Sequence, residues 1–279
     1  MAKSLKNTPK PFIIDDETIN DPVVRDKVFV PTISGDVKGH GLVPRDYRIH
    51  PAEMFEPPSA ITVKPRSEWS AFLKEQVRLQ ARLSDLRTWK TLDQDGQGYC
   101  WAYSTTGCVQ YLRAVNNQPY VRLSAHAVGC KVKNFRNEGG WCGLSAKFHR
   151  EQGCPSVELW PEKSMSRSND RPEVWANAAL HKVTEDWVDL TRDVYDQNLT
   201  EEQIATCLMS GIPCALDFNW WSHSVCGVNW VEVEPGSFGP MIDNSWTDAW
   251  GENGTAVLRG SKAKANGAVA LRVTGASPI

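Results

Sequence analysis

The sequence predicts an α+β protein with a helical first lobe and a second lobe built from an antiparallel β-sheet or barrel, preceded by an extended, proline-rich N-terminal arm. Three observations lead to this prediction. Nine of the 17 prolines lie between Pro9 and Pro65, apolar residues at helical spacing dominate the next part of the chain, and short β-rich runs separated by Gly, Pro and Asn fill the remainder. Helices followed by antiparallel strands are typical of two packed lobes, with a cleft between them as a natural binding site.

The N-terminal arm covers residues 1–66, because this stretch shows no sustained helical or strand periodicity and is interrupted by proline. Such a segment cannot easily form a core of its own, so we expect it to lie along its own domain or along a partner protein. Residues 67–279 are expected to form one domain, with a helical lobe over about 67–175 and a β lobe over about 176–279.

Helices and strands are predicted in that order along the domain. Ser67 can cap a helix whose apolar positions, Trp69 to Leu83, fall close to one face, and this helix should end near Ser84. The other predicted helices cover 100–112, the residues after 124, and 143–150. The predicted strands cover 213–218, 224–233, 240–244, 254–259 and 268–273.

Composition disfavours several functions. The 31 basic and 33 acidic residues give a formal net charge of −2, so no excess positive field attracts nucleic acid or anionic lipid. The first residues are polar and lack the apolar stretch of a signal peptide or membrane helix. The eight cysteines are spread along the chain without a CxxC pair, which favours free thiols in a reducing compartment over a zinc site or a disulfide scaffold.

The most informative stretch is a polar, glycine-containing loop, 92–104, that places Cys100 in the first turn of a predicted helix. Unpaired backbone N–H groups and the helix dipole stabilise negative charge there, which lowers the pKa of a thiol toward the reactive thiolate. A lone cysteine at a helix start is more often a small buried hydrophobic residue. Its placement alone therefore leaves both interpretations open.

The residues around Cys100 resemble the nucleophile loop and helix of the papain family of cysteine peptidases. Gln94, Gly98 and the run CWAYS at 100–104 match that pattern. Further landmarks follow in the family's order, namely Leu123-Ser124, Gly139-Gly140, Ser222-His223-Ser224-Val225, Asn244-Ser245-Trp246 and Trp250-Gly251-Glu252-Asn253-Gly254. The resemblance covers roughly 86–273 and implies the papain-like two-lobe fold.

The same resemblance implies the chemistry of a thiol peptidase that forms an acyl-enzyme. Cys100 would be the nucleophile, and His223 would share its proton and later protonate the leaving amine. Asn244 would orient the imidazole and fix its tautomer, and Trp246 would shield that hydrogen bond from water. Gln94 would donate to the oxyanion, an interaction worth roughly 3 kcal/mol. Without Cys100 and Asn244, His223 would be interpreted as a core histidine on a strand.

Spacing supports this assignment, because His223 lies 123 residues and Asn244 lies 144 residues after Cys100, against roughly 130 to 150 in the family. The resemblance places Gly139 and Gly140 beside the cleft, where backbone without side chains can pair with an extended substrate. Trp141 is expected there as well.

The pocket for a substrate side chain is expected to be lined by Trp141, Cys142 and Ser224, whose mixture of sizes suggests no charged preference. No metal or other cofactor is expected.

The sequence departs from the family at two points. The family usually has a cysteine three positions before the nucleophile, bridged to one just ahead of the Gly-Gly pair, and this chain has Gln97 and Asn137 there. The arm also lacks the helical motif of the family's inhibitory propeptides. We therefore expect a structural or docking arm rather than an inhibitory leader, and a reducing location rather than a secreted protein.

Three functions remain open on the sequence. The first is a thiol peptidase acting on peptides or proteins. The second is a structural or assembly protein, for example a component of a viral particle, that uses a papain-like domain as a building block and docks its arm on neighbouring subunits. The third keeps the nucleophile but cleaves another amide, such as one in a cell-wall peptide.

Overall fold

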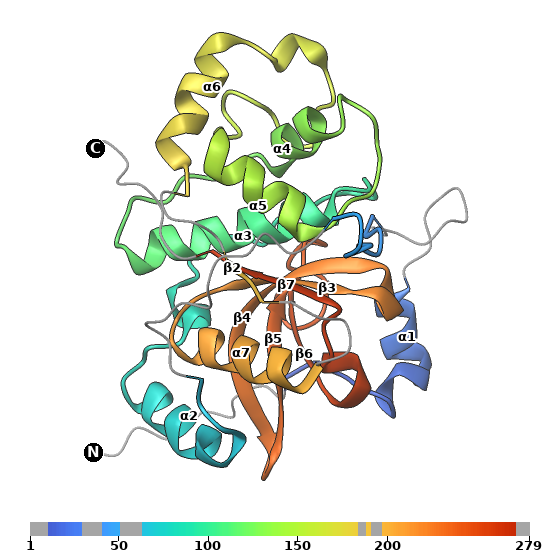
Figure 1. The fold of residues 1–279 in the computed structure, drawn as a ribbon, viewed down its shortest axis with the longest axis vertical. Helices are drawn as coiled ribbons and strands as arrows, with labels where there is room; N and C mark the ends of the chain where they lie inside the picture. Colours follow the sequence, from blue (N-terminus) through green and yellow to red (C-terminus); the bar gives the residue numbers. More distant parts are fainter. Residues whose placement is uncertain (1–10, 30–40, 51–62, 184–187, 191–196, 272–279) are drawn as a thin grey trace.

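The structure is a computed structural model that describes residues 11–29, 41–50, 63–183, 188–190 and 197–271. Figure 1 shows a group of helices stacked on one side of a twisted sheet, with one long helix at the boundary between the two. The predicted α+β class is confirmed. Expectations for residues 1–10, 30–40 and 51–62 of the arm, and for 272–273 of the last predicted strand, lie outside the described residues.

Helices occupy most of the places that the sequence predicts. The α-helices of the described residues are α1 (Pro22–Val28), α2 (Trp69–Arg78), α3 (Cys100–Val115), α4 (Ala125–Val132), α5 (Cys142–Glu151), α6 (Pro172–Ala178) and α7 (Gln197–Met209). None of the helices in these ranges combines the length and apolarity needed to cross a membrane. The prediction contains α2 to α5 and lacks α1, α6 and α7. Residues 204–209 of α7 are all buried, so this helix has no single apolar stripe to detect.

Strands form one mixed sheet. They are β1 (Ile13–Ile14), β2 (Val188–Asp189), β3 (Cys214–Phe218), β4 (His223–Glu234), β5 (Ser237–Asp243), β6 (Thr255–Leu258) and β7 (Gly267–Ala270). Their order in space is β1-β6-β5-β4-β3-β7-β2. The pairs are antiparallel except β1 with β6, which is parallel. Each of the five predicted strands corresponds to one of β3 to β7.

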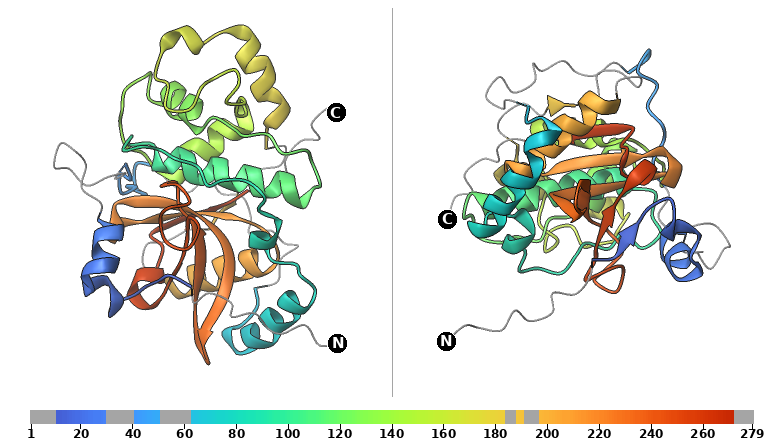
Figure 2. Two further views of the ribbon diagram at one scale, coloured as in Figure 1. Left: turned by 180° about the vertical axis from the view of Figure 1, so that it is seen from behind. Right: turned by 90° about the horizontal axis from the view of Figure 1, so that it is seen from below.

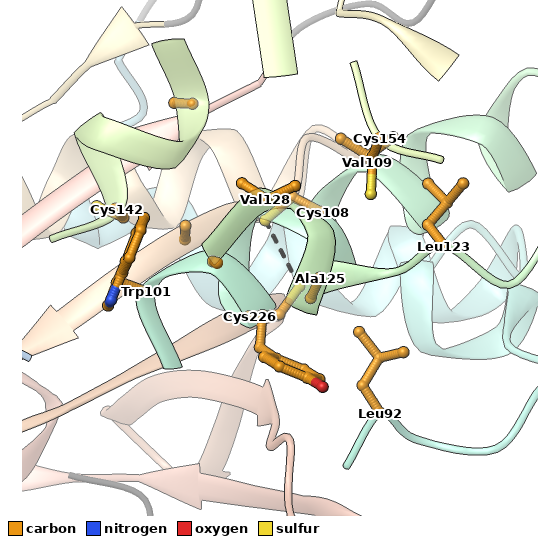
Figure 3. Packing of buried hydrophobic residues seen from close by; sticks show 14 of the residues in the cluster. Leu92, Trp101, Cys108, Val109, Leu123, Ala125, Val128, Cys142, Cys154 and Cys226 are labelled. Carbon is orange, nitrogen blue, oxygen red and sulfur yellow. Dashed lines mark hydrogen bonds between the residues drawn. The ribbon is translucent and has the colours of Figure 1, made fainter. Parts of the chain in front are cut away.

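The helical core is organised around α3, which packs against α4, α5 and strand β4. Figure 3 shows this cluster from close by, with Trp101 and Cys142 at one end and Leu123 and Cys154 at the other. The helix is buried from Cys100 through Arg113. Because neighbours surround α3 on nearly all sides, its first turn is held rigidly at the boundary of the two lobes.

A second core fills the sheet lobe, and it includes α2. The Trp69 ring packs edge-on against Trp230 and Phe238, with centroid distances of 5.3 and 5.2 Å. The assignment of this helix to the helical lobe is therefore wrong. Its expected end near Ser84 is also wrong, because α2 ends at Arg78 and Gln80 then takes a left-handed conformation with φ 53°.

The first described part of the arm is not the loop that the sequence predicts. Asp21 accepts a hydrogen bond from the Val23 N–H at 2.8 Å and caps α1, and Pro22 occupies its first turn. The two last carbonyls of this helix region, on Lys27 and Val28, accept the indole N–H groups of two sheet-lobe tryptophans. Figure 2 shows α1 and α2 at opposite sides of the sheet lobe. A helix of seven residues gives little periodicity, and its stability comes from this docking.

Candidate active site

Cys100 begins α3 at the boundary of the lobes. The residue before it, Tyr99, makes no side-chain capping hydrogen bond, so the first backbone N–H groups of the helix are not taken by an N-cap side chain. The structure thus places Cys100 at the helix start predicted from its loop. The side chain has no exposed surface.

His223 begins β4, and Asn244 follows the end of β5. The His223 Nε2 and Asn244 Oδ1 atoms lie 2.8 Å apart. An amide oxygen only accepts, so Nε2 carries the hydrogen of this bond and Nδ1 is left as the basic nitrogen. The imidazole packs against two indoles, with ring centroids 4.9 Å from Trp221 and 4.7 Å from Trp246.

The histidine strand lies directly against the nucleophile helix. Ser224, the neighbour of His223, has its hydroxyl oxygen 3.0 Å from that of Ser104, one turn into α3. The backbone N–H of Ser224 faces the Cys100 sulfur. The structure therefore brings Cys100, His223 and Asn244 to one place at the junction of α3, β4 and β5.

Gln94 is fixed in the loop before α3. Its side-chain Nε2 donates to the Gln97 carbonyl at 2.7 Å, and its Oε1 accepts from the Ser245 hydroxyl. The backbone N–H of Gln94 also donates to the Ser245 carbonyl at 3.0 Å. Ser245 follows Asn244 in the motif, but its residue type alone does not predict this contact with Gln94.

The Gly139-Gly140 pair forms the other wall of the cleft. A Cβ at Gly140 would lie 2.8 Å from the Trp101 ring, so this backbone approaches α3 more closely than any side chain would permit. At the place where the family usually has a disulfide, Asn137 Oδ1 instead accepts a hydrogen bond from Gly98 N–H at 2.7 Å. This hydrogen bond connects the same two loops without a thiol.

The cleft is filled by residues 41–43 of the arm. Gly140 N–H donates to the Gly41 carbonyl at 2.8 Å, and Val43 N–H donates to the Gly140 carbonyl at 2.9 Å. On the opposite side, Leu42 N–H donates to the Ser222 carbonyl at 3.2 Å. The pairing of Leu42 with Gly140 is parallel. The glycine wall thus binds an extended backbone, and that backbone belongs to the same chain.

The closed cleft controls the charge of the nucleophile. Burial raises the pKa of the Cys100 thiol to about 12, and the carboxyl of Asp217 also raises it. The backbone N–H groups of Ser224, Gly41 and Trp101 face the sulfur and lower the pKa without offsetting burial. The expected lowering of this pKa is therefore wrong for the closed state, because the burial of the sulfur outweighs these backbone N–H groups. Cys100 is a neutral thiol here.

The remaining predicted site residues lie around this centre. Trp141 is half-buried and packs against His50 of the arm with tilted rings, whose centroids are 4.7 Å apart. Cys142 is buried at the start of α5. In the part of the chain that the structure describes, no group of three or more His, Cys, Asp or Glu side chains is arranged to hold a metal ion.

A two-lobe α+β fold with a cysteine at a helix start, a histidine on the facing strand and an orienting asparagine defines a cysteine-type peptidase. Comparison with known families agrees with this class. Residues 78–273 match the family described as papain family cysteine protease, and the chain belongs to that family.

Individual relatives are distant. The chain is 23% identical over 271 residues to vignain of Phaseolus vulgaris, covering 90% of this chain and 69% of that protein. It is 24% identical over 209 residues to the cysteine endopeptidase RepA of Oryza sativa subsp. japonica, covering 67% of this chain and 53% of that protein. The structure of xylellain, a cysteine protease from Xylella fastidiosa, superposes with a TM-score of 0.60 at 16% identity, over 85% of this chain and 96% of that one. This likeness concerns the fold.

Proposed function

We propose that this chain is a latent thiol peptidase that hydrolyses peptide bonds through an acyl-enzyme on Cys100. The observation that carries the proposal is the bond from His223 Nε2 to Asn244 Oδ1, at 2.8 Å. This bond fixes the tautomer in which Nδ1 is the base, as proton transfer from a thiol on the facing helix requires.

The reaction follows from these groups. His223 Nδ1 accepts the thiol proton, and the Cys100 sulfur attacks the carbonyl carbon of the peptide bond while the carbonyl π-electrons move to oxygen. The tetrahedral intermediate then collapses, the C–N bond breaks, and the imidazolium delivers its proton to the leaving amine. Water next attacks the thioester with His223 as base, which releases a carboxylic acid and restores the thiol.

Gln94 would stabilise the oxyanion together with the backbone N–H of Cys100. The contacts of Gln94 Oε1 with Ser245 and of Nε2 with the Gln97 carbonyl hold the amide in one orientation, so the group is pre-positioned. Preorganised donors of this kind are worth most where water is excluded, and the surroundings of Gln94 are buried.

The arm would keep the enzyme latent. Its residues 41–43 hydrogen-bond both walls of the cleft and cover the sulfur, so a substrate cannot reach Cys100 until they leave. We therefore favour an inhibitory role for the arm over the structural role that its sequence suggests. Substrates would be extended peptides or unfolded proteins that pair with Gly140 in its place.

A thiol-directed epoxide tests the proposal on the full chain. The protein is treated with the epoxide and digested, and adducts at all eight cysteines are quantified by mass spectrometry. We expect selective modification of Cys100 once the arm is displaced, and cleavage of an unfolded protein substrate under the same conditions. Cys100→Ala should abolish cleavage, whereas Cys207→Ala, a matched loss of a buried thiol in the core of the sheet lobe, should retain it. Even labelling of all cysteines would contradict the proposal.

A further inference from the structure

Two carboxylates lie buried beside the cleft. Asp217 lies on β3 and Asp189 on β2, with 5% and 3% of their surfaces exposed. Strand β7 runs between them, pairing Asp189 with Val269 and Asp217 with Gly267. Since paired residues and alternate residues of a strand share one face, both carboxylates are on the sheet face that Val269 turns toward the helical core.

The space beside these carboxylates, which the Arg45 side chain occupies, is an acidic pocket adjacent to the reacting atoms. Asp217 accepts from the hydroxyl of Ser224, the residue whose backbone N–H faces the Cys100 sulfur. Its other oxygen accepts the Cys142 N–H at 3.1 Å, at the start of α5. One residue, Ser224, therefore contacts both the acidic pocket and the nucleophile.

The arm places a cation in this pocket. Arg45 follows the segment that fills the cleft, and its Nη1 forms an ion pair with Asp189 in which the two side chains are 8% and 1% exposed. A Cβ at Gly143 would be 3.5 Å from the same nitrogen, so the first turn of α5 borders the guanidinium. Tyr47 stacks on Arg45, with the guanidinium carbon 4.7 Å from the ring centroid.

A buried carboxylate is costly unless a cation compensates it. When the arm leaves, Arg45 leaves the pocket with it, and Asp189 and Asp217 remain beside the open cleft. A substrate with a basic side chain near the scissile bond would restore the ion pair, whereas a neutral side chain of the same size would not. Repulsion and desolvation would also exclude acidic side chains.

We propose that the Asp189–Asp217 pocket is a specificity subsite that selects an arginine or lysine side chain close to the scissile bond, and that Arg45 occupies it as an internal mimic. This inference rests on the proposed peptidase function. It reverses the expectation of an uncharged preference, which considered only Trp141, Cys142 and Ser224. The two aspartates were missed because only the pairing of β7 with both of their strands brings them together.

The test uses epoxysuccinyl dipeptide amides in sets of three. The members of a set differ in one side chain, which is arginine, citrulline or leucine. One set varies the first residue of the dipeptide, and a second set varies the second residue. Citrulline has the shape of arginine without its charge. The rate of Cys100 modification is measured by mass spectrometry in full-length Arg45→Ala. A second full-length background, Gly41→Ala, is run in parallel because it displaces the arm and keeps Arg45, in case the first variant does not fold.

We expect the arginine probe to react about 100-fold faster than the citrulline probe at one of the two positions. Adding Asp189→Asn should reduce this ratio to near one. Adding Glu173→Gln, which removes an exposed carboxylate on α6, should leave the ratio unchanged.

Three results would overturn the inference. Equal rates for arginine and citrulline at both positions, with Cys100 modified, would refute the charged subsite and leave the peptidase intact. A ratio that survives Asp189→Asn would refute the assignment to this pocket. Failure of all three probes to modify Cys100 in both backgrounds would refute the proposed function and the subsite together.

Discussion

Gly41→Ala is expected to open the cleft without shortening the chain. A Cβ at residue 41 would lie 2.2 Å from the carbonyl oxygen and 2.3 Å from the carbonyl carbon of Gly98. These are backbone atoms in the loop that leads into α3, so no side-chain rotation can relieve the contact. The arm must move away from Gly98, and its hydrogen bonds to the cleft walls are broken as it moves.

The expected increase in the open population follows from the contacts that the arm loses. Residues 41–43 make three backbone hydrogen bonds with Gly140 and Ser222, each worth about 1 kcal/mol. Exposure of Leu42, which is buried in the closed state, adds up to about 2 kcal/mol. The hydrogen bonds alone correspond to an increase of about 150-fold in the open population.

The assay is the initial rate of Cys100 modification by a small thiol-directed epoxide. We expect Gly41→Ala to react about 100-fold or more faster than wild type. Gly211→Ala is the matched control, because it replaces a glycine with φ 75° at the end of α7 and so costs stability without touching the cleft. Equal Cys100 rates in Gly41→Ala and wild type would refute the closed-cleft reasoning, as would an equal increase in Gly211→Ala.

The remaining predictions concern the catalytic group and the core, and activities are compared in the Gly41→Ala background. Gln94→Ala should lower kcat by about 100-fold through loss of an oxyanion donor; Ser245→Ala should lower it less, and the double variant should resemble Gln94→Ala alone. Asn244→Ala should lower kcat/KM by about 100-fold, because His223 loses its fixed tautomer. Burial lowers the pKa of His149 to about 3, so only the unfolded state gains its proton below pH 6.5. The free energy of unfolding should therefore fall between pH 7 and pH 5. This fall should be about 2 kcal/mol smaller in His149→Gln than in wild type.

Each of these expectations has a contradicting result. Additive losses in the Gln94 and Ser245 double variant would show that Ser245 does not act through Gln94. A normal kcat/KM in Asn244→Ala, measured with a fluorogenic peptide, would remove its orienting role. Urea unfolding of His149→Gln with the same loss between pH 7 and pH 5 as wild type would show that this histidine does not carry the dependence.

Much of the fold was predictable because the elements that build it have local signals. The loop before Cys100 carries turn residues, α3 carries a sustained apolar pattern, and β3 to β7 are short runs between Gly, Pro and Asn. The positions of Cys100, His223 and Asn244 were predictable from motif and order, and the structure brings them to one site.

The missed features depend on contacts between distant parts of the chain. Helix α1 is stabilised by the indoles of Trp221 and Trp250, far along the sequence, so its own residues predict little. The role of Gly41 appears only when it meets Gly98. Likewise Asp189 and Asp217 become one pocket only because β7 inserts between their strands.

The arm is attached to the rest of the chain at two separate places, and this determines how its inhibition can end. Residues 41–43 fill the cleft, while Ile13 and Ile14 extend the sheet beside β6 and α1 rests on two tryptophans. Such an arm is a bivalent ligand. While one attachment is intact, the other segment stays near its binding site at an effective concentration in the millimolar range. A single cut between residues 50 and 63 would therefore not release it on dilution. The cleft opens when residues 41–43 leave it, whereas complete removal of the arm requires both attachments to fail, so that removal should be cooperative.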